Sequence, residues 1–509
     1  MTLDRRAFLV TPAAAATAAQ QNTAGITVDL TPQFEISPTL YMQFMEPLGV
    51  TDSSCEAAWD YEKDDWRQDL IDVVHDLAPG MVRFGGNYSR YYKWREGVGP
   101  AAKRPLMINY DWGGKETNRV GTAEFADFCK RVGNAEPMYC VNFLSDGHKA
   151  FWKTTHEGNR SGDANEAADW VSYCNDPSDK LRLSHGRKEP YNFRYWQIGN
   201  ETSYSDRGFP RDEAIRHTID FAKAMRARDP KLILIGWGDR EQGRDETLWA
   251  GRMAQRAGEH LDMIAIHLMG QRPTRKDTVL AGNKYQYAPE QAWAEMLELA
   301  GNVDQRLRTL EQAVGSVSKR LNLAVTEGHL TLMPHNANSV LLEWLSAAYH
   351  ARSMNAYQRH GAKVKIATLA DFFGNRWTVN AVMIPVPRGK SYLTPAGVVM
   401  RLFGRHNGKN GVDVTNAPSS LDIAASTTGN KLFLHVLNQD YRRPVTAAIR
   451  AAGRRVTGGR VFEIAPENPR EYVSNEQPKA FAPVEKPLPK EGTWTFPARS
   501  VSALEVDLA

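Results

Sequence analysis

The stretch Arg194–Glu201 reads RYWQIGNE, a short run of β-forming residues that ends in a carboxylate. Similar runs recur along the chain, and most of them are continuously apolar. Parallel strands covered by helices on both faces have this character, because neither face meets water. The eight candidate strands are Tyr41–Glu46, Met81–Gly86, Pro137–Phe143, Arg194–Asn200, Lys231–Trp237, Leu261–His267, Leu323–Glu327 and Lys365–Phe372.

Between the candidate strands, apolar residues recur at spacings of three and four, which predicts amphipathic helices. The expected helices are Trp66–Leu77, Ala123–Val132, Glu166–Tyr173, Asp212–Ala227, Glu246–His260, Pro289–Val303, Val340–His360 and Pro395–Phe403. Strands that alternate with helices in this way predict an α/β protein built on a (β/α)8 TIM barrel. We expect this barrel to span residues 41–404 and to carry long loops.

The pattern changes after Gly404, where the helical spacing stops and Gly, Pro, Thr and Asn interrupt the chain every few residues. Strands are expected at Lys431–Leu437, Val445–Ile449, Arg460–Glu463 and Ser500–Val506. These features predict a C-terminal β-sandwich over residues 405–509, joined by an N-terminal β segment over residues 25–40. No low-complexity linker separates the two regions, so we expect the domains to pack together.

The composition is that of a folded protein with more than one domain. The chain has 509 residues, 42% of them hydrophobic and 24% charged, which excludes disorder and coiled coil. Lys and Arg number 63 against 59 Asp and Glu. The basic residues are scattered apart from a tract around Arg450, Arg454, Arg455 and Arg460, so nucleic acid is not an expected partner.

The cysteines Cys55, Cys129, Cys140 and Cys174 form no CxxC pair and have no paired histidine spacing near them. Neither a zinc site nor a disulfide framework is therefore indicated. We expect free and mostly buried thiols.

The N-terminus has the layout of a bacterial twin-arginine export signal. Arg5 and Arg6 precede a weakly apolar, alanine-rich run that ends in small residues near Ala19. We expect residues 1–24 to be cleaved and the mature protein to be periplasmic or secreted. The alternative is a disordered tail with a chance pair of arginines. No other stretch is long and apolar enough to span a membrane, so the mature form is expected to have no membrane partner.

Two glutamates follow apolar runs at the positions where barrel enzymes carry their chemistry, the carboxyl ends of strands. Glu201 follows the fourth candidate strand, and Glu327 ends the seventh. A carboxylate beside the core costs stability unless it is paired, so a function is the better explanation than a chance placement. A pair of carboxylates that flank a bond is what glycoside hydrolysis requires. The alternative is two surface glutamates in salt bridges.

Other strand ends carry polar or aromatic residues suited to a sugar site. Arg83 can hold a carboxylate ionised, and hydroxyl groups of a sugar need hydrogen-bond partners such as a carboxylate or an amide. Aromatic rings and a histidine near the strand mouths fit either a sugar site or ordinary core packing. The candidate substrate-binding residues are Glu46, Arg83, Asn87, Asn200, Trp237, His267 and Trp377.

Several motifs of this chain, taken together, resemble the α-L-arabinofuranosidases of glycoside hydrolase family 51, which belong to the barrel clan A. The motifs are RFGGN (83–87), YKWREGVGP (92–100), FMEPLG (44–49), EPMYCVN (136–142), EAADWVSYCN (166–175) and IGNE (198–201). The tail Thr493–Leu508 is similar to the strand that closes the β-sandwich of that family. The resemblance covers almost the whole chain after the N-terminal signal.

The resemblance implies a retaining mechanism through a covalent glycosyl-enzyme intermediate, with neither a metal nor an organic cofactor. It implies that Glu201 is the acid/base and Glu327 the nucleophile, with Arg83 as the partner of the nucleophile. Asn200 would bind the 2-hydroxyl of the sugar, and Glu46 and Asn87 would bind the sugar as well. The side-chain carboxyls of Glu201 and Glu327 are then expected about 5–5.5 Å apart.

This chain departs from the family pattern near the expected site. Family members usually have Asp-Glu-Trp around the nucleophile and His-x-Tyr after strand six, whereas this chain has Thr326-Glu327-Gly328 and His267-Leu268-Met269. The expected His after the first-strand glutamate is Pro47. An exo-acting α-L-arabinofuranosidase that trims side chains of plant polysaccharides is the first hypothesis. A galactofuranosidase, β-xylosidase or endoglucanase of the same clan is the second, and a carbohydrate-binding barrel without activity is the third. The sequence leaves homo-oligomerisation open.

Overall fold

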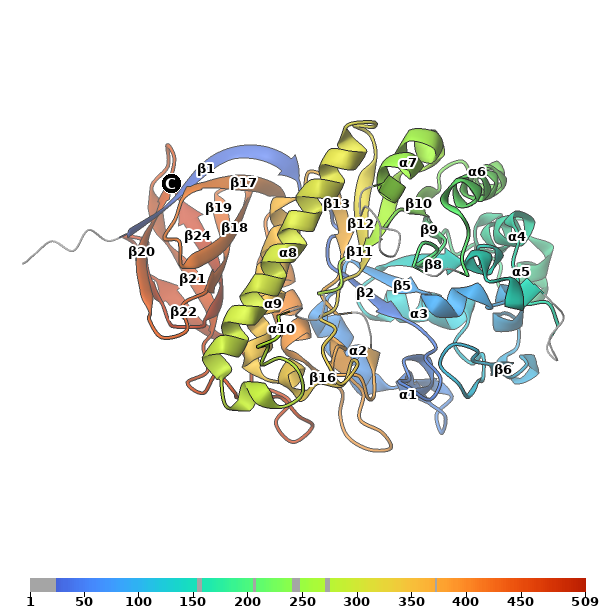
Figure 1. The fold of residues 1–509 in the computed structure, drawn as a ribbon, viewed down its shortest axis with the longest axis horizontal. Helices are drawn as coiled ribbons and strands as arrows, with labels where there is room; N and C mark the ends of the chain where they lie inside the picture. The colour runs from blue at the N-terminus through green and yellow to red at the C-terminus, as the bar shows by residue number, and fades with distance from the viewer. Residues whose placement is uncertain (1–23, 153–157, 205–206, 240–247, 271–274, 371–372) are drawn as a thin grey trace, which may run out of the picture.

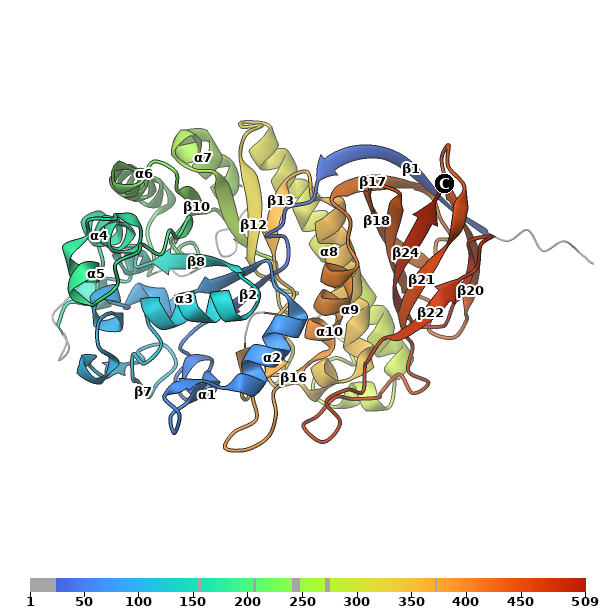
Figure 2. The same cartoon turned by 180° about the vertical axis from the view of Figure 1, so that it is seen from behind.

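The computed structural model describes residues 24–152, 158–204, 207–239, 248–270, 275–370 and 373–509. Two units lie side by side, a barrel with surrounding helices and an all-β unit at one end (Figures 1 and 2). The α/β barrel with a C-terminal sandwich, expected from the alternation of strands and helices, is confirmed.

The barrel is an eight-stranded parallel sheet with the order β13-β12-β11-β10-β9-β8-β5-β2. The backbone N–H of Ala367 donates to the carbonyl of Leu40 at 2.8 Å, and a parallel bridge joins Tyr41 to Ala367. The last strand therefore meets the first, and the sheet closes. The strands are β2 (Met42–Met45), β5 (Met81–Phe84), β8 (Glu136–Val141), β9 (Tyr195–Ile198), β10 (Ile233–Trp237), β11 (Met263–His267), β12 (Asn322–Glu327) and β13 (Val364–Ala367).

Helices cover the outside of the barrel and bury their apolar faces against the strands. In α2, for example, Leu70, Ile71, Val74 and Leu77 are buried on one face. The helices are α1 (Cys55–Ala58), α2 (Gln68–Leu77), α3 (Thr122–Arg131), α4 (Ala164–Asn175), α5 (Lys180–Ser184), α6 (Arg211–Arg228), α7 (Leu248–Ala257), α8 (Pro289–Gly315), α9 (Ala347–Arg359) and α10 (Pro395–Arg405). Short strand pairs in the loops are β3 (Trp59–Asp60) with β4 (Asp65–Trp66), and β6 (Met107–Ile108) with β7 (Lys115–Glu116).

Some boundaries differ from those expected from the sequence. Helix α8 runs for 27 residues, beyond the expected end at Val303, because buried residues continue at helical spacing through Leu307, Leu310 and Val314. The expected helix Val340–His360 begins instead as two 3-10 turns, Ser339–Leu342 and Trp344–Ser346, before α9. A three-stranded sheet of β14 (Phe373–Gly374), β15 (Val382–Met383) and β16 (Tyr392–Leu393) precedes α10.

The second unit is built from both ends of the described chain. Strand β1 (Ala24–Glu35) pairs antiparallel with β17 and parallel with β20, so it lies inside the sheet order β22-β21-β24-β19-β18-β17-β1-β20-β23. Its Ile26 and Val28 belong to a second apolar core with Leu434, Phe496 and Val506. The other strands are β17 (Asn410–Asn416), β18 (Leu421–Thr428), β19 (Lys431–Asn438), β20 (Val445–Ala451), β21 (Val456–Ile464), β22 (Val484–Leu488), β23 (Thr493–Phe496) and β24 (Val501–Leu508).

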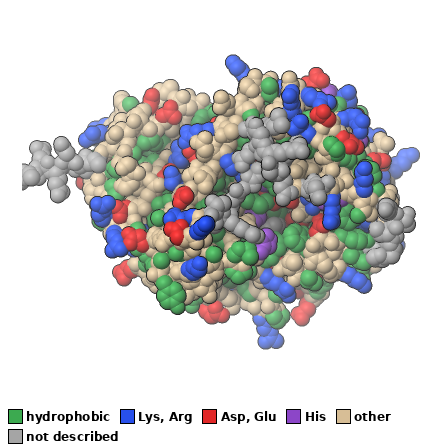
Figure 3. Space-filling view, viewed as in Figure 1, with side chains coloured by type: hydrophobic (Ala, Val, Ile, Leu, Met, Phe, Trp, Pro, Cys, Tyr) green, Lys and Arg blue, Asp and Glu red, His purple; other side chains and the backbone are tan. Residues whose placement is uncertain are grey.

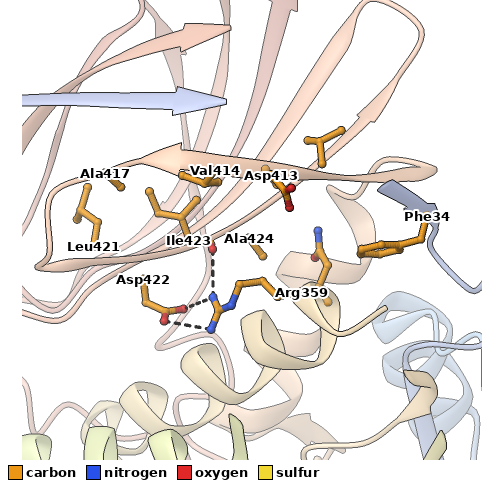
Figure 4. Close-up of a pocket in the computed structure, with 12 residues that line it drawn as sticks. Phe34, Arg359, Asp413, Val414, Ala417, Leu421, Asp422, Ile423 and Ala424 are labelled. Carbon is orange, nitrogen blue, oxygen red and sulfur yellow. Dashed lines mark hydrogen bonds and ion pairs between the residues drawn. The ribbon is translucent and has the colours of Figure 1, made fainter. Parts of the chain in front are cut away.

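The two units meet where α9 packs against β18 and β19. Figure 4 shows this contact: Arg359 of α9 reaches across to Asp422 and to the carbonyl of Ile423 on β18. The Asp422 carboxylate accepts from Arg359 Nη1 at 3.0 Å and from the buried amide of Asn355 at 2.8 Å. A cavity lies at this contact between the units, and Phe34, at the end of β1, is one of the residues that line it. The units thus share polar contacts as well as apolar ones.

The surface and the cysteines agree with the composition. On the face seen in Figure 3, positive and negative side chains are interspersed rather than gathered in one basic stripe. Cys55, Cys129, Cys140 and Cys174 are free and buried. Among the described helices, none is both long and apolar enough to cross a membrane. The arginine pair at residues 5 and 6 lies outside the described residues.

Candidate active site

Glu201 and Glu327 lie at the same end of the barrel and face each other. Glu327 is the last residue of β12, and Glu201 follows β9 by three residues. The backbone between β9 and Glu201 turns sharply, with left-handed φ values of 83° at Gly199 and 54° at Glu201. One carboxylate oxygen of each glutamate lies within 4.8 Å of the other. Oxygens this close fit the short carboxyl separation of retaining glycosidases, about 5–5.5 Å, better than the 6.5 Å or more of inverting ones.

His267, the last residue of β11, lies between the two carboxylates. Its Nδ1 is 3.2 Å from Oε1 of Glu201 and 3.4 Å from Oε2 of Glu327. The backbone N–H of His267 donates to Asp239 at 3.0 Å, which fixes the end of the strand. The same imidazole nitrogen is therefore within ion-pair distance of both carboxylates.

Arg83 of β5 holds Glu327 from the other side. The guanidinium is fully buried, and its Nη1 is 3.2 Å from Oε1 of Glu327. Its Nε donates to Gln197 at 2.9 Å and its Nη2 to Asn200 at 2.5 Å. Each edge of the guanidinium has an acceptor, so Arg83 is held in one orientation and presents a fixed positive charge to Glu327.

Three further polar residues lie next to Arg83 and Glu327: Asn200, Asn87 and Glu46. The amide of Asn200 donates to Oδ1 of Asn87 at 3.1 Å. Glu46, directly after β2, is 3% exposed and accepts from the backbone N–H of Tyr88 at 2.8 Å. Burial and the charge of Glu327 raise the pKa of Glu46 well above its ordinary value. The three residues are brought together with the carboxylate pair, and Gly86 leaves room for Glu46, because an added Cβ would lie 2.0 Å from its Oε2.

The two tryptophans pack against other aromatic rings. Trp237 is 1% exposed, packs edge-on against His267 with ring centroids 4.6 Å apart, and donates to Ser203 at 2.8 Å. Trp237 therefore packs in the interior beside His267, as in the core-packing alternative, and a stacking role stays a prediction. Trp377 is 7% exposed and packs against Trp112 with centroids 5.3 Å apart. It belongs to an aromatic cluster with Trp112 and His335, and its role in sugar binding stays a prediction.

The sequence reading missed a cationic residue next to Glu201. Arg90, in the 3-10 turn η1 (Asn87–Arg90), is 7% exposed and lies among three carboxylates. The guanidinium is 3.7 Å from Glu201, 3.8 Å from Asp146 and 3.6 Å from Asp111. No strand-end rule points to Arg90, because it lies in a loop and its partners come from three other segments.

Asp146 holds the turn that carries Glu201. It lies in η4 (Leu144–Gly147), where four successive residues have left-handed φ values of 48°, 55°, 49° and 82°. Its Oδ1 accepts from the backbone N–H of Asn200 at 2.9 Å and from the hydroxyl of Thr202 at 2.6 Å. Left-handed backbone at residues other than glycine costs about 1–2 kcal/mol each. Strained conformations of this kind persist where surrounding contacts stabilise them. Here the strained turn places the buried carboxylate of Asp146 against Asn200 and Thr202, the residues on either side of Glu201.

The electrostatics of the site couple the two glutamates. Burial opposes ionisation of Glu201, but the hydrogen bond and charge of His267 and the charge of Arg90 outweigh it and lower the pKa of Glu201. Burial, with the charge of Glu201, raises the pKa of Glu327 against the opposing charges of His267 and Arg83. Two carboxyls this close titrate as a pair, so one proton is retained by the pair while the other is lost. Burial also raises the pKa of Asp146 to about 6.

The site also contains a compact set of atoms that resembles a metal site. One oxygen each of Glu201 and Glu327 and a nitrogen of His267 lie within 4.8 Å of one another. The Arg83 guanidinium is already 3.2 Å from the Glu327 carboxylate, so a cation bound there would lie close to it. That fixed positive charge makes the position unfavourable for a metal ion.

Two departures from the family motifs have a structural basis. An added Cβ at Gly328 would lie 2.2 Å from the carbonyl oxygen of Thr368, so the tryptophan usual after the nucleophile has no space. Where a tyrosine is usual, Met269 offers no hydroxyl group. The nucleophile still has a charged hydrogen-bond donor, because Nη1 of Arg83 is 3.2 Å from Oε1 of Glu327.

Family models match both units of the chain. Residues 73–288 match the alpha-L-arabinofuranosidase 1 domain, and residues 332–500 match the alpha-L-arabinofuranosidase C-terminal domain. Over 214 residues the chain is 34% identical to a probable alpha-L-arabinofuranosidase C of Aspergillus niger, covering 40% of this chain and 38% of that protein. The chain thus spans about two fifths of the length of such fungal relatives. It is 27% identical over 362 residues to intracellular exo-alpha-(1->5)-L-arabinofuranosidase 1 of Bacillus subtilis, covering 66% of this chain and 67% of that protein.

Solved structures support the architecture. An alpha-L-arabinofuranosidase from Thermotoga maritima in complex with arabinose superposes with a TM-score of 0.77 at 24% identity, over 95% of this chain and all of that chain. The family 44 endoglucanase Cel44A of Clostridium thermocellum shares the fold at a TM-score of 0.63 and 14% identity, over 95% of this chain and 100% of that one. The two matched family models, together with the motifs around Arg83 and Glu201, identify the chain as an α-L-arabinofuranosidase-like member of glycoside hydrolase family 51.

Proposed function

We propose that this chain is a retaining, exo-acting α-L-arabinofuranosidase that removes arabinofuranosyl residues from side chains of plant polysaccharides. The observation that carries the proposal is the carboxylate pair, Glu201 and Glu327, with oxygens within 4.8 Å of each other at the ends of β9 and β12. The names of the curated relatives and the matched family models support the choice of sugar.

In the first step, the Glu327 carboxylate attacks the anomeric carbon while the bond to the leaving oxygen breaks. Glu201 donates its proton to that oxygen, so the leaving group departs as a neutral alcohol. Arg83 holds Glu327 in place for attack through its 3.2 Å contact. The product of this step is a sugar bound covalently to Glu327.

In the second step, Glu201 acts as the base. It removes a proton from water, the water oxygen attacks the anomeric carbon, and the bond to Glu327 breaks with retention of configuration. Before the first step the proton retained by the pair must reside on Glu201. In the free site the pKa of Glu201 is lowered and that of Glu327 is raised, which favours the proton on Glu327, so the reaction requires its transfer to Glu201 when the substrate binds.

Azide rescue of two variants tests the mechanism. Glu201→Ala and Glu327→Ala should each fold normally and lose about 10²–10⁴-fold in activity on aryl arabinofuranosides. External azide should restore turnover of an activated aryl substrate by Glu201→Ala, because azide needs no base to attack the glycosyl-enzyme. If azide rescued neither variant while both still bound the sugar, the retaining assignment would be wrong.

A panel of aryl glycosides tests the sugar. The absence of a tyrosine at Met269 favours keeping galactofuranosides, β-xylosides and glucosides in the panel. Hydrolysis of the arabinofuranoside alone supports the proposal. Hydrolysis of another glycoside in its place retains the catalytic pair but overturns the sugar, and binding without any hydrolysis indicates a carbohydrate-binding barrel.

We also propose export through the twin-arginine route, which the Arg5-Arg6 pair and the alanine-rich run after it support. Activity should then be found in the periplasmic or secreted fraction of cells that express the full chain. Activity that remains wholly in the cytoplasmic fraction overturns this part of the proposal.

A further inference from the structure

A small cavity with a basic lining lies beside β20, at the end of the sandwich that faces away from the barrel (Figures 1 and 2). Its volume is about 350 Å³, and its rim is formed by the turn between β20 and β21 and the turn between β22 and β23. The charged residues of the lining are Arg450, Arg454, Arg455, Lys490 and Glu491. The mechanism in the barrel uses none of them.

Backbone hydrogen bonds fix the first of these turns. The N–H of Arg454 donates to the carbonyl of Ala451 at 3.2 Å, and Gly453 between them has a left-handed φ of 73°. The N–H of Ala452 donates to the carbonyl of Val28 on β1 at 2.9 Å. The turn is therefore bonded to the sheet, and the arginines that end it start from a fixed backbone.

The second turn is bonded to the same strand. The N–H of Gly492 donates to the carbonyl of Pro489 at 2.9 Å, and the N–H of Ile449 on β20 donates to the carbonyl of Gly492 at 3.0 Å. Lys490 and Glu491 lie between these two points and are exposed. Two turns from separate hairpins thus bring their charged residues to one place on the surface.

The cationic side chains of this lining have no carboxylate partners. Within the part of the chain that the structure describes, none of the four forms an ion pair of 4.0 Å or less. Arg454 instead donates to the carbonyl of Leu508 at 3.1 Å, which leaves its charge uncompensated. Arg460 of the same basic tract is paired with Glu505 and does not line the cavity.

Uncompensated charges of one sign favour an anionic ligand. Like charges that lie close together repel, and an anion bound among them removes that repulsion. The lining has four cations against the single carboxylate of Glu491. The guanidinium group donates paired hydrogen bonds to a carboxylate or a phosphate. The ligand that fits this cavity is therefore a chain that carries several such anionic groups.

The lining favours an acidic polysaccharide over other polyanions. Single-stranded nucleic acids are bound through aromatic stacking, and duplexes through basic residues spread along a face. None of the described residues that line the cavity is aromatic, and the four cations gather around one small cavity. Membrane-binding surfaces insert exposed apolar side chains, whereas Ile449 and Ala451 of this lining are buried. A uronate chain offers a carboxylate and several hydroxyl groups on each sugar unit.

We propose that this cavity binds uronate units of an acidic polysaccharide without cleaving them. The choice of uronate among anions rests on the proposed function, because plant polysaccharides include chains of uronic acids. The cavity lies on the sandwich, whereas the carboxylate pair lies in the barrel. A chain held at the cavity therefore raises the local concentration of its neutral side chains at the barrel, as binding at a second site does.

Calorimetric titration with an oligogalacturonate, which has no arabinofuranosyl unit, tests this binding apart from catalysis. The wild type should bind it at low ionic strength, and added salt should weaken the binding. The neutral methyl ester of the same oligosaccharide should not bind. Arg455→Ala/Lys490→Ala, at two exposed positions, should weaken the binding about tenfold and leave kcat/KM on 4-nitrophenyl α-L-arabinofuranoside unchanged.

Arg442→Ala/Arg443→Ala is the matched control, because it removes the same charge from exposed positions just before the other end of β20. This variant should bind oligogalacturonate as the wild type does. No binding to the wild type, equal binding of the methyl ester, or equal losses in the two double variants would each overturn the proposal.

Two further outcomes separate this inference from its alternatives. Duplex DNA or vesicles of phosphatidylglycerol that bind more tightly than oligogalacturonate, with a loss in Arg455→Ala/Lys490→Ala, overturn the uronate assignment. A wild type that binds oligogalacturonate but hydrolyses no aryl glycoside overturns the proposed function and supports the binding site.

Discussion

At the scale of single residues, charge balance around Glu201 depends on Arg90 and its acidic neighbours. Arg90 is shared by Glu201, Asp146 and Asp111 at 3.6–3.8 Å, so its charge acts on the acid only in part. Asp146 is fully buried, and burial raises its pKa to about 6, which makes it anionic above that pH. In this range Asp146 compensates Arg90 and reduces the influence of Arg90 on Glu201.

Replacing Asp146 with asparagine should therefore change the pH dependence of activity. Asp146→Asn keeps an acceptor for Asn200 and Thr202 but removes a negative charge next to Arg90. The less compensated guanidinium lowers the pKa of Glu201, and an acid with a lower pKa loses its proton at lower pH. The alkaline limb of kcat/KM should move down by roughly half a unit.

The matched control is Thr202→Val, which removes one hydrogen bond to Asp146 without a change of charge. Its alkaline limb should stay in place. An unchanged limb in Asp146→Asn would mean that Asp146 acts only through the backbone of Asn200.

At the scale of elements, one histidine joins two long helices of the barrel. His360, directly after α9, has Nδ1 2.8 Å from Glu311 and Nε2 3.0 Å from Asp304, both on α8. Although burial opposes the charge, the two carboxylates raise the pKa of His360 to about 9. The imidazolium therefore links α8 to α9 near neutral pH.

Removal of this link should destabilise the protein in a defined pH window. The folded pKa lies above the ordinary value of 6.5, so the stabilisation is complete below about pH 6.5 and is lost as pH rises through about 9. His360→Gln should lower the free energy of unfolding by on the order of 2–3 kcal/mol at pH 6, since one pKa unit is worth about 1.4 kcal/mol.

Denaturant unfolding at pH 6 and pH 10 measures this difference. The variant and the wild type should differ much less at pH 10 than at pH 6. A difference that is independent of pH would show that His360 contributes by packing and not by its charge.

At the scale of the whole molecule, the barrel and the sandwich depend on a small polar contact as well as on apolar packing. Asp422 on β18 is 11% exposed and accepts from Arg359 and Asn355 of α9, and Arg352 lies 3.8 Å away. Asn355 is fully buried, and without the Asp422 carboxylate its amide keeps only the carbonyl oxygens of residues 422 and 435, at 3.1 and 3.5 Å. A hydrogen bond to a charged group contributes about 1.5–3 kcal/mol.

Asp422→Ala should thus lower the melting temperature by several degrees without a matching change in KM, because the contact lies on the outer helix and not at the carboxylate pair. The control is Asp413→Ala, an exposed residue that lines the same cavity between the units (Figure 4). Thermal unfolding and kinetics on the aryl substrate measure both effects. Equal melting temperatures for the two variants would contradict a role for Asp422 at the interface.

The sequence alone was sufficient to predict the barrel, the sandwich and the position of the two carboxylates. Alternation of apolar strands with amphipathic helices is a local pattern, and each period depends on neighbours a few residues away. The rule that barrel chemistry lies at the carboxyl ends of strands then selects Glu201, Glu327, Arg83 and His267 from their positions in the count. The strand ends of β8 could have been searched by the same rule, and Asp146 lies five residues beyond the end of that strand.

Only the tertiary structure decided the contacts between segments that are far apart in the chain. Arg90 meets carboxylates from three other loops, and His267 faces both glutamates, because closure of the sheet brings these strand ends together. Trp237 is of a residue type that stacks on sugars, yet its side chain is buried. Whether a side chain is buried depends on which other segments pack against it. The left-handed turn at Leu144–Gly147 is not evident from the residue types either, because leucine and serine seldom adopt such a backbone. Contacts with distant segments help to stabilise it: Asp146 binds Asn200 and Thr202, and the N–H of Leu144 donates to the carbonyl of Gly162.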